Sequence, residues 1–275
     1  MLKQRVITAV LLLAVLLPAL FYPSPEPFCA LALVMIVGGG WEWGRLNGCR
    51  SGVALAGGLA LGGVLVALWW QVGLVSSQPW LWGLVSAVWL VLAVVLLRRG
   101  VSGWAGIPRA LRLLAGWVLI GAAWWAMAQA RYLGVEMLLS IFLLVWVADI
   151  AAYFGGKAFG RRKLAPQISP GKSWAGVYSG VLGVLVLGVG WVALRGAVPE
   201  HLYGHLWSLG WSVAALALLV LTGMSVAGDL IESLVKRSAG MKDSSGLLPG
   251  HGGVLDRVDA LLPVLPMAML VLSWH

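Results

Sequence analysis

Long apolar segments separated by short polar connections run along the whole chain. Nine runs come close to, or reach, the ~17–25 residues that a helix needs to cross a bilayer. They occupy residues 6–22, 28–46, 53–72, 79–97, 110–128, 134–154, 174–194, 208–228 and 259–274. The pattern predicts an all-α, polytopic integral membrane protein with about nine transmembrane helices, of which the first and last are the shortest.

The composition independently indicates a membrane protein. The chain has 275 residues, of which 61% are hydrophobic and only 11% charged, and its mean hydropathy is +0.94. These values exclude an ordinary soluble domain of this length. The 37 glycines suit close helix packing in lipid, and many of the 17 tryptophans lie near the ends of the runs, as interfacial anchors do.

The basic residues fall almost entirely on one side of this arrangement. If the nine runs cross the membrane in turn, the connections between them lie alternately on its two sides. On this assignment 17 of the 19 Lys and Arg residues lie on one side, and only Arg131 and Arg195 lie on the other. The positive-inside rule predicts that the N-terminus, residues 155–173 and residues 229–259 are cytoplasmic, with the C-terminus outside. A cleaved signal peptide at residues 1–22 is less favoured, because no small-x-small cleavage site follows it.

The net charge of +9 indicates which partners to expect. In a chain without a soluble domain, basic loops favour the anionic leaflet surface, so we predict contact with membrane lipids and no nucleic-acid partner. Cys29 and Cys49 lie at opposite ends of the second run and cannot pair. His201 and His205, four residues apart, favour a solvated outer loop over a metal pair.

Residues 229–259 concentrate most of the chemistry. This stretch holds five carboxylates, four Lys or Arg and one His, although charge in or beside a bilayer is costly unless it is paired or hydrated. Asp229, Glu232, Ser233, Lys236 and Arg237 have the spacing of one helix face, and that helix should stop at Gly240.

A glycine-rich loop then leads to a second polar helix end. Its sequence, SSGLLPGHGG, allows close backbone approach to a ligand, and Asp256 and Asp259 again share one helical face. Two helix ends with facing carboxylates, joined by such a loop, suit a divalent cation that holds a polyphosphate.

The segment 155–173 suggests a second anion site. SPGKS resembles the end of a phosphate-binding P-loop, but the first glycine of that motif would fall at Pro166, which has no N–H to offer. We predict instead that Ser169, Lys172 and Ser173 bind an anion at the start of the helix near Trp174. The neighbouring Lys and Arg at 157–163 could serve as topology determinants alone.

Four single residues leave alternatives open. Asp149 either caps its helix or faces the same cavity as Asp229. His251 is either a phosphate contact or general acid, or only a turn residue. Asp229 and Asp256 could each form a buried ion pair with Lys236 or Arg257 instead of binding a metal.

Two motifs resemble the signature of the phosphatidate cytidylyltransferases, the CDP-diacylglycerol synthases. The first is Ser233-x-x-Lys236-Arg237, Lys242-Asp243, Pro249-Gly-His251-Gly-Gly253 and Asp256-Arg257-x-Asp259. The second runs from Asp149-x-x-Ala-Tyr153 to Ile168-Ser169-Pro170-x-Lys172-Ser173. The resemblance covers residues 145 to the C-terminus, so we divide the single membrane domain into N-terminal helices at 1–134 and a C-terminal catalytic region at 135–275.

The resemblance implies transfer of CMP from CTP to phosphatidate, with Mg²⁺, alone or with a second cation, held by Asp229 and Asp256. It also implies a homodimer in the bacterial cytoplasmic membrane. We expect Asp229, Asp256, Lys236 and Arg237 to be catalytic. The residues expected to bind substrate are Asp149, Ser169, Lys172, Ser173, Ser233, Lys242, Asp243, His251, Arg257 and Asp259.

One departure and two rival functions remain. The family usually carries Glu where this chain has Ala175, so any role of that carboxylate must be supplied elsewhere. The nearer rival is another CTP-dependent membrane enzyme, acting on a polyprenol or an ether lipid. The farther rival is a cation-coupled transporter with Asp149, Asp229 and Asp256 as ion ligands, although the adjacent Lys and Arg would repel a passing cation.

Overall fold

The computed structural model describes residues 2–75 and 79–274, and each predicted run contains a helix. The helices that correspond to the runs are α1 (Leu2–Phe21), α2 (Glu26–Leu46), α3 (Ser51–Val72), α4 (Pro79–Ala105), α5 (Arg109–Leu133), α6 (Val135–Phe159), α7 (Trp174–Arg195), α9 (Trp211–Ser238) and α11 (Leu261–Leu272). Two short helices, α8 (Leu202–Ser208) and α10 (Leu255–Val258), lie in the connections.

Seven of the described helices, α2 to α7 and α9, are long and apolar enough to cross a membrane. The helical fold is therefore confirmed. The apolar part of α1, Val6–Phe21, and the whole of α11 are shorter. At 12 residues, α11 spans about 18 Å, less than the ~30 Å hydrocarbon core, so the count of nine spans stays a prediction.

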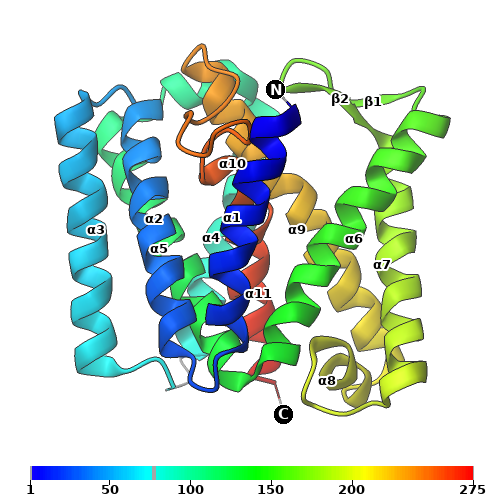
Figure 1. The fold of residues 1–275 in the computed structure, drawn as a ribbon. Helices are drawn as coiled ribbons and strands as arrows, with labels where there is room; N and C mark the ends of the chain where they lie inside the picture. Colours follow the sequence, from blue (N-terminus) through cyan, green and yellow to red (C-terminus); the bar gives the residue numbers. More distant parts are fainter. Residues whose placement is uncertain (1, 76–78, 275) are drawn as a thin grey trace.

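The helices run side by side between two ends of the molecule (Figure 1). The start of α1, the segment after α6 and the 239–254 loop between α9 and α10 gather at one end, and the C-terminus lies at the other. This arrangement agrees with the two sides expected from the basic residues. Which end faces the cytoplasm stays a prediction.

The segment after α6 differs from the expected open loop. α6 continues to Phe159, and β1 (Lys163–Ala165) then pairs antiparallel with β2 (Ser169–Ser173), with Lys163 opposite Ser173. The all-α prediction therefore needs one correction, a two-stranded hairpin beside the helices. Pro166 and Pro170 lack N–H donors and cannot continue a helix, whereas a hairpin pairs the remaining backbone groups.

Small residues bring α7 against α6. A Cβ atom added at Gly176 would lie 2.9 Å from Ala152 O, and one at Gly180 would lie 3.0 Å from Ala148 O. Glycine is required for this approach, as is usual at close helix contacts in membranes. The packing places β2 and the start of α7 beside the turn of α6 that carries Asp149.

The opposite end is held by the two basic residues that the sequence placed there. Arg131 is buried and donates to Leu20 O at 3.0 Å and Tyr22 O at 2.6 Å, which fixes the turn between α1 and α2. Arg195 forms an ion pair with Glu136. The prediction that His201 lies in a solvated loop is wrong, because this side chain is fully buried and caps α8.

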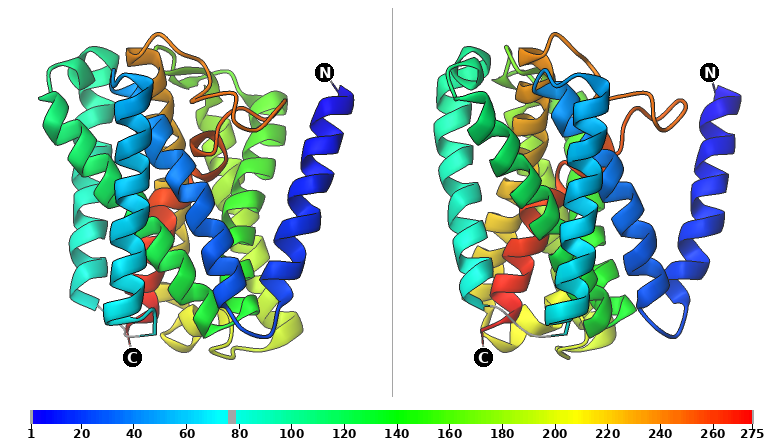
Figure 2. Two further views of the ribbon diagram at one scale, coloured as in Figure 1. Left: turned by 60° about the vertical axis from the view of Figure 1, so that its left-hand side comes forward. Right: turned by 90° about the vertical axis from the view of Figure 1, so that its left-hand side faces the viewer.

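α1 stands apart from the other helices, and the 239–254 loop reaches out toward it (Figure 2). Thr8 Oγ1 donates a hydrogen bond to Pro249 O at 2.9 Å. The N-terminal helix therefore contacts the glycine-rich loop, although 241 residues separate the two in the sequence.

Candidate functional site

An ion pair joins the hairpin to α9. Lys172 Nζ lies 2.5 Å from Asp229 Oδ2, and both side chains are partly exposed. Ser233 Oγ, one turn further along α9, lies 3.3 Å from Asp229 Oδ1. The i, i+4 spacing of Asp229 and Ser233 thus produces the polar face that the sequence predicted.

The Lys172–Asp229 pair lines a cavity of about 550 Å³ between α6, the hairpin, α7 and α9. Asp149 lines it as well, so of the two alternatives left open for Asp149 the structure shows the one in which it shares a cavity with Asp229. The polar or charged residues of the lining are Asp149, Tyr153, Lys157, Lys163, Lys172, Ser173 and Asp229. Lys157 and Lys163 are among them, so these two lysines bring positive charge to the cavity in addition to any role in membrane topology.

The two serines beside Lys172 lie in structural positions. Ser173 is buried, and its Oγ accepts a hydrogen bond from Gly176 N at 3.2 Å, so it caps the N-terminus of α7. Ser169 lies in β2 opposite Ala165 and is not part of the cavity lining. Lys172 is therefore the residue of this motif whose charged group faces the cavity. Ala175, where the family usually has Glu, lies half-buried in the first turn of α7.

A second charged cluster joins the end of α9 to α10. Lys236 Nζ lies 2.6 Å from Asp256 Oδ1 and also pairs with Glu232. Asp256 Oδ2 accepts hydrogen bonds from Gly253 N at 2.7 Å, Ser244 N at 2.9 Å and Ser244 Oγ at 2.9 Å. The ion pair between Asp256 and Lys236, left open by the sequence, is thus present.

These contacts set the ionisation of Asp256. Burial alone would raise its pKa, but the hydrogen bonds from Lys236 and from the backbone N–H groups of Gly253 and Ser244 outweigh burial. The pKa of Asp256 is therefore lower than that of an ordinary aspartate.

Glu42 of α2 was not predicted, and it holds the glycine-rich loop. It is fully buried and accepts four hydrogen bonds from that segment. They come from Ser245 Oγ (2.5 Å), Leu255 N (2.8 Å), Val254 N (2.9 Å) and Ser244 Oγ (3.1 Å). The sequence could have indicated Glu42, because it is the one carboxylate in the apolar run at 28–46. Carboxylates within transmembrane segments rarely occur without a partner or a function.

The glycines of the loop permit this close approach. A Cβ atom at Gly253 would lie 2.0 Å from Ser244 Oγ and 2.3 Å from Glu42 Oε1. Gly250 and Gly252 have φ angles of +78° and +84°, a region that side chains other than glycine rarely adopt. The loop therefore approaches carboxylates of the protein itself, whereas the sequence suggested approach to a ligand.

The remaining predicted residues of this segment do not join either cluster. Arg237, Lys242 and Asp243 are exposed at the end of α9 and in the loop. Arg257 turns back and donates to His251 O, at 2.9 Å from Nε. His251 lies in a turn closed by its N–H to Leu248 O, and its Nδ1 is buried without a hydrogen-bond partner. Both interpretations of His251 therefore stay open.

The carboxylates supply only part of the ligand set that Mg²⁺ requires. Within residues 2–75 and 79–274, no three His, Cys, Asp or Glu side chains converge as a preformed metal site. Asp259 Oδ1 accepts from Ala260 N, and the Asp259 carbonyl packs against Gly228, next to Asp229. Mg²⁺ prefers oxygen donors and commonly binds through one or two carboxylates plus substrate phosphates and water. Asp229 and Asp256 belong to separate ion pairs, so each could offer carboxylate oxygen to a cation that arrives with a polyphosphate, but the described residues alone do not form a complete metal site.

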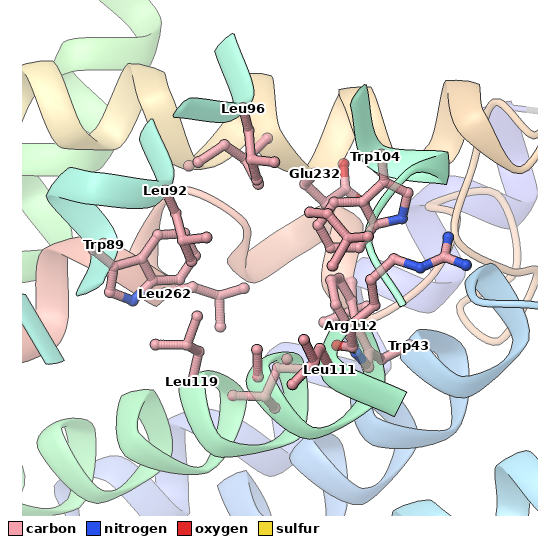
Figure 3. Close-up of a pocket in the computed structure, with 17 residues that line it drawn as sticks. Trp43, Trp89, Leu92, Leu96, Trp104, Leu111, Arg112, Leu119, Glu232 and Leu262 are labelled. Atoms are coloured by element: carbon pink, nitrogen blue, oxygen red, sulfur yellow. The ribbon is translucent and has the colours of Figure 1, made fainter. Parts of the chain in front are cut away.

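An apolar cavity of about 250 Å³ lies on another side of α9, between α4 and α5 (Figure 3). Trp89 and Leu92 line one end, and Glu232 and Arg112 lie at the other end with two tryptophans, Trp43 and Trp104. Glu232 also pairs with Lys236, so the cavity begins beside the second charged cluster.

These features define a polytopic membrane protein with two clusters of lysines and carboxylates at one end of the helices. The model of the cytidylyltransferase family matches residues 3–275. The chain therefore belongs to the cytidylyltransferase family, whose members are nucleotidyltransferases.

Several relatives carry a more specific name. A phosphatidate cytidylyltransferase of Pseudomonas aeruginosa is 40% identical over 275 residues, which cover 97% of this chain and 95% of the relative. One of Haemophilus influenzae is 37% identical, with 97% and 96% of the two chains covered. A more distant one, of Staphylococcus epidermidis, is 33% identical over 69% of this chain and 68% of its own length.

Proposed function

We propose that this protein transfers CMP from CTP to phosphatidate, giving CDP-diacylglycerol and pyrophosphate for phospholipid synthesis. The names of its relatives support these substrates. The structural observation that carries the proposal is the Lys172–Asp229 pair on an open polar cavity large enough for a nucleotide. The assay that tests it is formation of a CMP-bearing lipid by the purified protein.

The reaction requires positioning and charge neutralisation. An oxygen of the phosphatidate phosphate forms a bond to the α-phosphorus of CTP, and the bond from that phosphorus to the bridging oxygen breaks. Pyrophosphate leaves with the electron pair of the broken bond. No general base is needed, because a phosphate monoester, with a second pKa near 6, is already an anion at neutral pH. The catalytic contribution is then mainly orientation and electrostatic stabilisation.

The two lysines of the ion pairs would hold the phosphates. Lys172 and Lys236 each neutralise a carboxylate in the structure, and an arriving phosphate would compete for the same ammonium groups. Arg237, Lys242 and Arg257 would add positive charge where the 239–254 loop borders the solvent. Ser233 would orient Asp229 through the hydrogen bond described above, and Asp259 would lie close to it, because the Asp259 carbonyl packs against Gly228.

We propose that Asp229 and Asp256 hold Mg²⁺, alone or with a second cation, once the nucleotide is bound. The metal would supply charge neutralisation for the triphosphate. One oxygen of Asp256 already accepts three hydrogen bonds, which leaves the Lys236-facing oxygen as the one available to a cation.

The lipid would approach from the membrane. We propose that the apolar cavity beside Glu232 takes one acyl chain of phosphatidate, because it starts at the cluster that contains Lys236 and is lined by Trp and Leu side chains. In a bacterial inner membrane the site would face the cytoplasm, where CTP is found, and the C-terminus would lie outside. We also propose that the protein assembles as a homodimer, as the family resemblance implies.

The two rival functions are less well supported. A polyprenol or ether lipid would satisfy the same phosphate chemistry, but the relatives at 37–40% identity are named for phosphatidate. A cation-coupled transporter does not explain why the chain belongs to a cytidylyltransferase family.

A further inference from the structure

The buried carboxylate of Glu42 connects the N-terminal helices to the second charged cluster. Ser244 Oγ lies 3.1 Å from Glu42 Oε2 and 2.9 Å from Asp256 Oδ2, so the two carboxylates share the single hydroxyl hydrogen of Ser244. Ser244 also donates its backbone N–H to Asp256. The position of Ser244, and with it two of the contacts of Asp256, therefore depends on Glu42.

Glu42 binds two separate points of the same loop. Ser245 lies on the α9 side of the 239–254 loop, and Val254 and Leu255 lie where the loop enters α10. All three donate to Glu42, at 2.5, 2.9 and 2.8 Å. A single carboxylate thus holds together two chain segments about ten residues apart, and Asp256 follows the second of them directly.

The environment requires a carboxylate at this position. Each oxygen of Glu42 accepts one backbone N–H and one serine hydroxyl, and no Lys, Arg or His forms an ion pair with it among the described residues. Gln has the same size, but its NH₂ group cannot accept a hydrogen bond. In Glu42→Gln one backbone N–H and one hydroxyl would lose their acceptor inside the protein, which is costly for buried donors.

We infer that Glu42 is a positioning residue for the nucleotidyl-transfer site: it holds the 239–254 loop so that Asp256 faces Lys236. This inference rests on the proposed function for its kinetic part only. Its structural part, the ordering of the loop by Glu42, holds for any reaction at this site.

Two variants and a matched control test the inference. Glu42→Gln removes acceptor capacity, and Ser245→Ala removes one donor that touches Glu42 and does not touch Asp256. Glu26→Gln is the control, because Glu26 is an exposed carboxylate at the other end of α2 and accepts from Tyr132. Each is measured for kcat and KM with CTP and phosphatidate, for Tm in detergent, and for amide hydrogen exchange of residues 239–256.

Glu42→Gln should lower kcat by about 30-fold, with KM for CTP changed by less than about threefold, and should speed exchange in residues 239–256 more than elsewhere. Ser245→Ala should show the same pattern at smaller amplitude, and Glu26→Gln should match the unmodified protein.

Two results would overturn the inference. Unchanged exchange in the loop would show that Glu42 does not order it, whether or not the protein transfers CMP. A uniform loss of Tm and exchange protection, with normal kcat in the folded fraction, would make Glu42 a stability residue only. If Glu42→Gln does not fold, Ser245→Ala decides by the same criteria. An unmodified protein without CMP transfer would refute the proposed function and leave the exchange comparison intact.

Discussion

Lys236 Nζ lies 2.6 Å from Asp256 Oδ1, and the same ammonium group pairs with Glu232. One cation therefore faces two carboxylates that are almost fully buried, at 5% and 7% side-chain exposure. This arrangement leaves acceptor capacity for a further positive group. For Lys236 to move toward a phosphate, another cation would have to take its place beside Asp256. A metal ion that arrives together with the nucleotide would meet this requirement.

The proposed metal ligands should be essential for turnover and not for folding. Asp229→Asn and Asp256→Asn keep the size of the side chain but remove the charge that Mg²⁺ requires. We expect each to lower turnover by about a thousandfold. Tm in detergent should stay within a few degrees, because Lys172 lies partly in solvent and Lys236 keeps Glu232.

The measurement is turnover against Mg²⁺ concentration, alongside Tm, with Glu200→Gln as the control at the opposite, exposed end of the protein. Loss of Tm together with normal turnover in the folded fraction would show that the two aspartates serve only as ion-pair partners.

Lys172 should contribute specifically to CTP binding. Lys172→Ala removes the ammonium group that faces the cavity, so we expect KM for CTP to rise, or turnover to fall, by about 10- to 100-fold. Arg161→Ala is the matched control, since Arg161 is exposed and does not line the cavity. Equal effects of the two changes would mean that the charge of the segment acts in bulk.

The apolar cavity should determine which acyl chains are accepted. Leu92→Trp places a large side chain in the cavity, whereas Val94→Trp, two residues along α4, adds the same side chain on the exposed face. We expect Leu92→Trp to lower kcat/KM for long-chain phosphatidate by about tenfold or more, with a much smaller effect on a dioctanoyl substrate. If both chain lengths are affected equally, the acyl chain binds elsewhere.

The orientation in the membrane follows from the distribution of basic residues. A reporter that is active only outside the cytoplasm should be active after His275 and inactive within residues 157–163. In the structure the end of α11 and the segment that follows α6 lie at opposite ends of the helices (Figure 1). The reverse pattern of activity would place the Lys172–Asp229 site away from cytosolic CTP.

The hydrophobic pattern located every long helix, because burial in lipid imposes the same apolar requirement on each residue of a span. It also located the polar face of α9, since helical spacing determines which side chains of one helix lie together. The division at residue 134 stays a prediction, although α4 and α5 of the first part pack against α9 and α11 of the second.

Other parts of the site depend on contacts between distant segments, which spacing along the chain does not encode. Glu42 lies about 200 positions before the serines that it binds, and the choice of Asp256 as the partner of Lys236 depends on where the loop returns. The hairpin at 163–173 was missed because its three- and five-residue strands are too short to show a period.

Transfer of CMP to phosphatidate can be measured by incubating the purified protein in detergent with labelled CTP, Mg²⁺ and phosphatidate. We expect a CMP-bearing lipid and an equal amount of pyrophosphate, both lost when phosphatidate is omitted or Mg²⁺ is chelated. A labelled lipid formed only when a polyprenol replaces phosphatidate, or no labelled lipid from any acceptor, would contradict it.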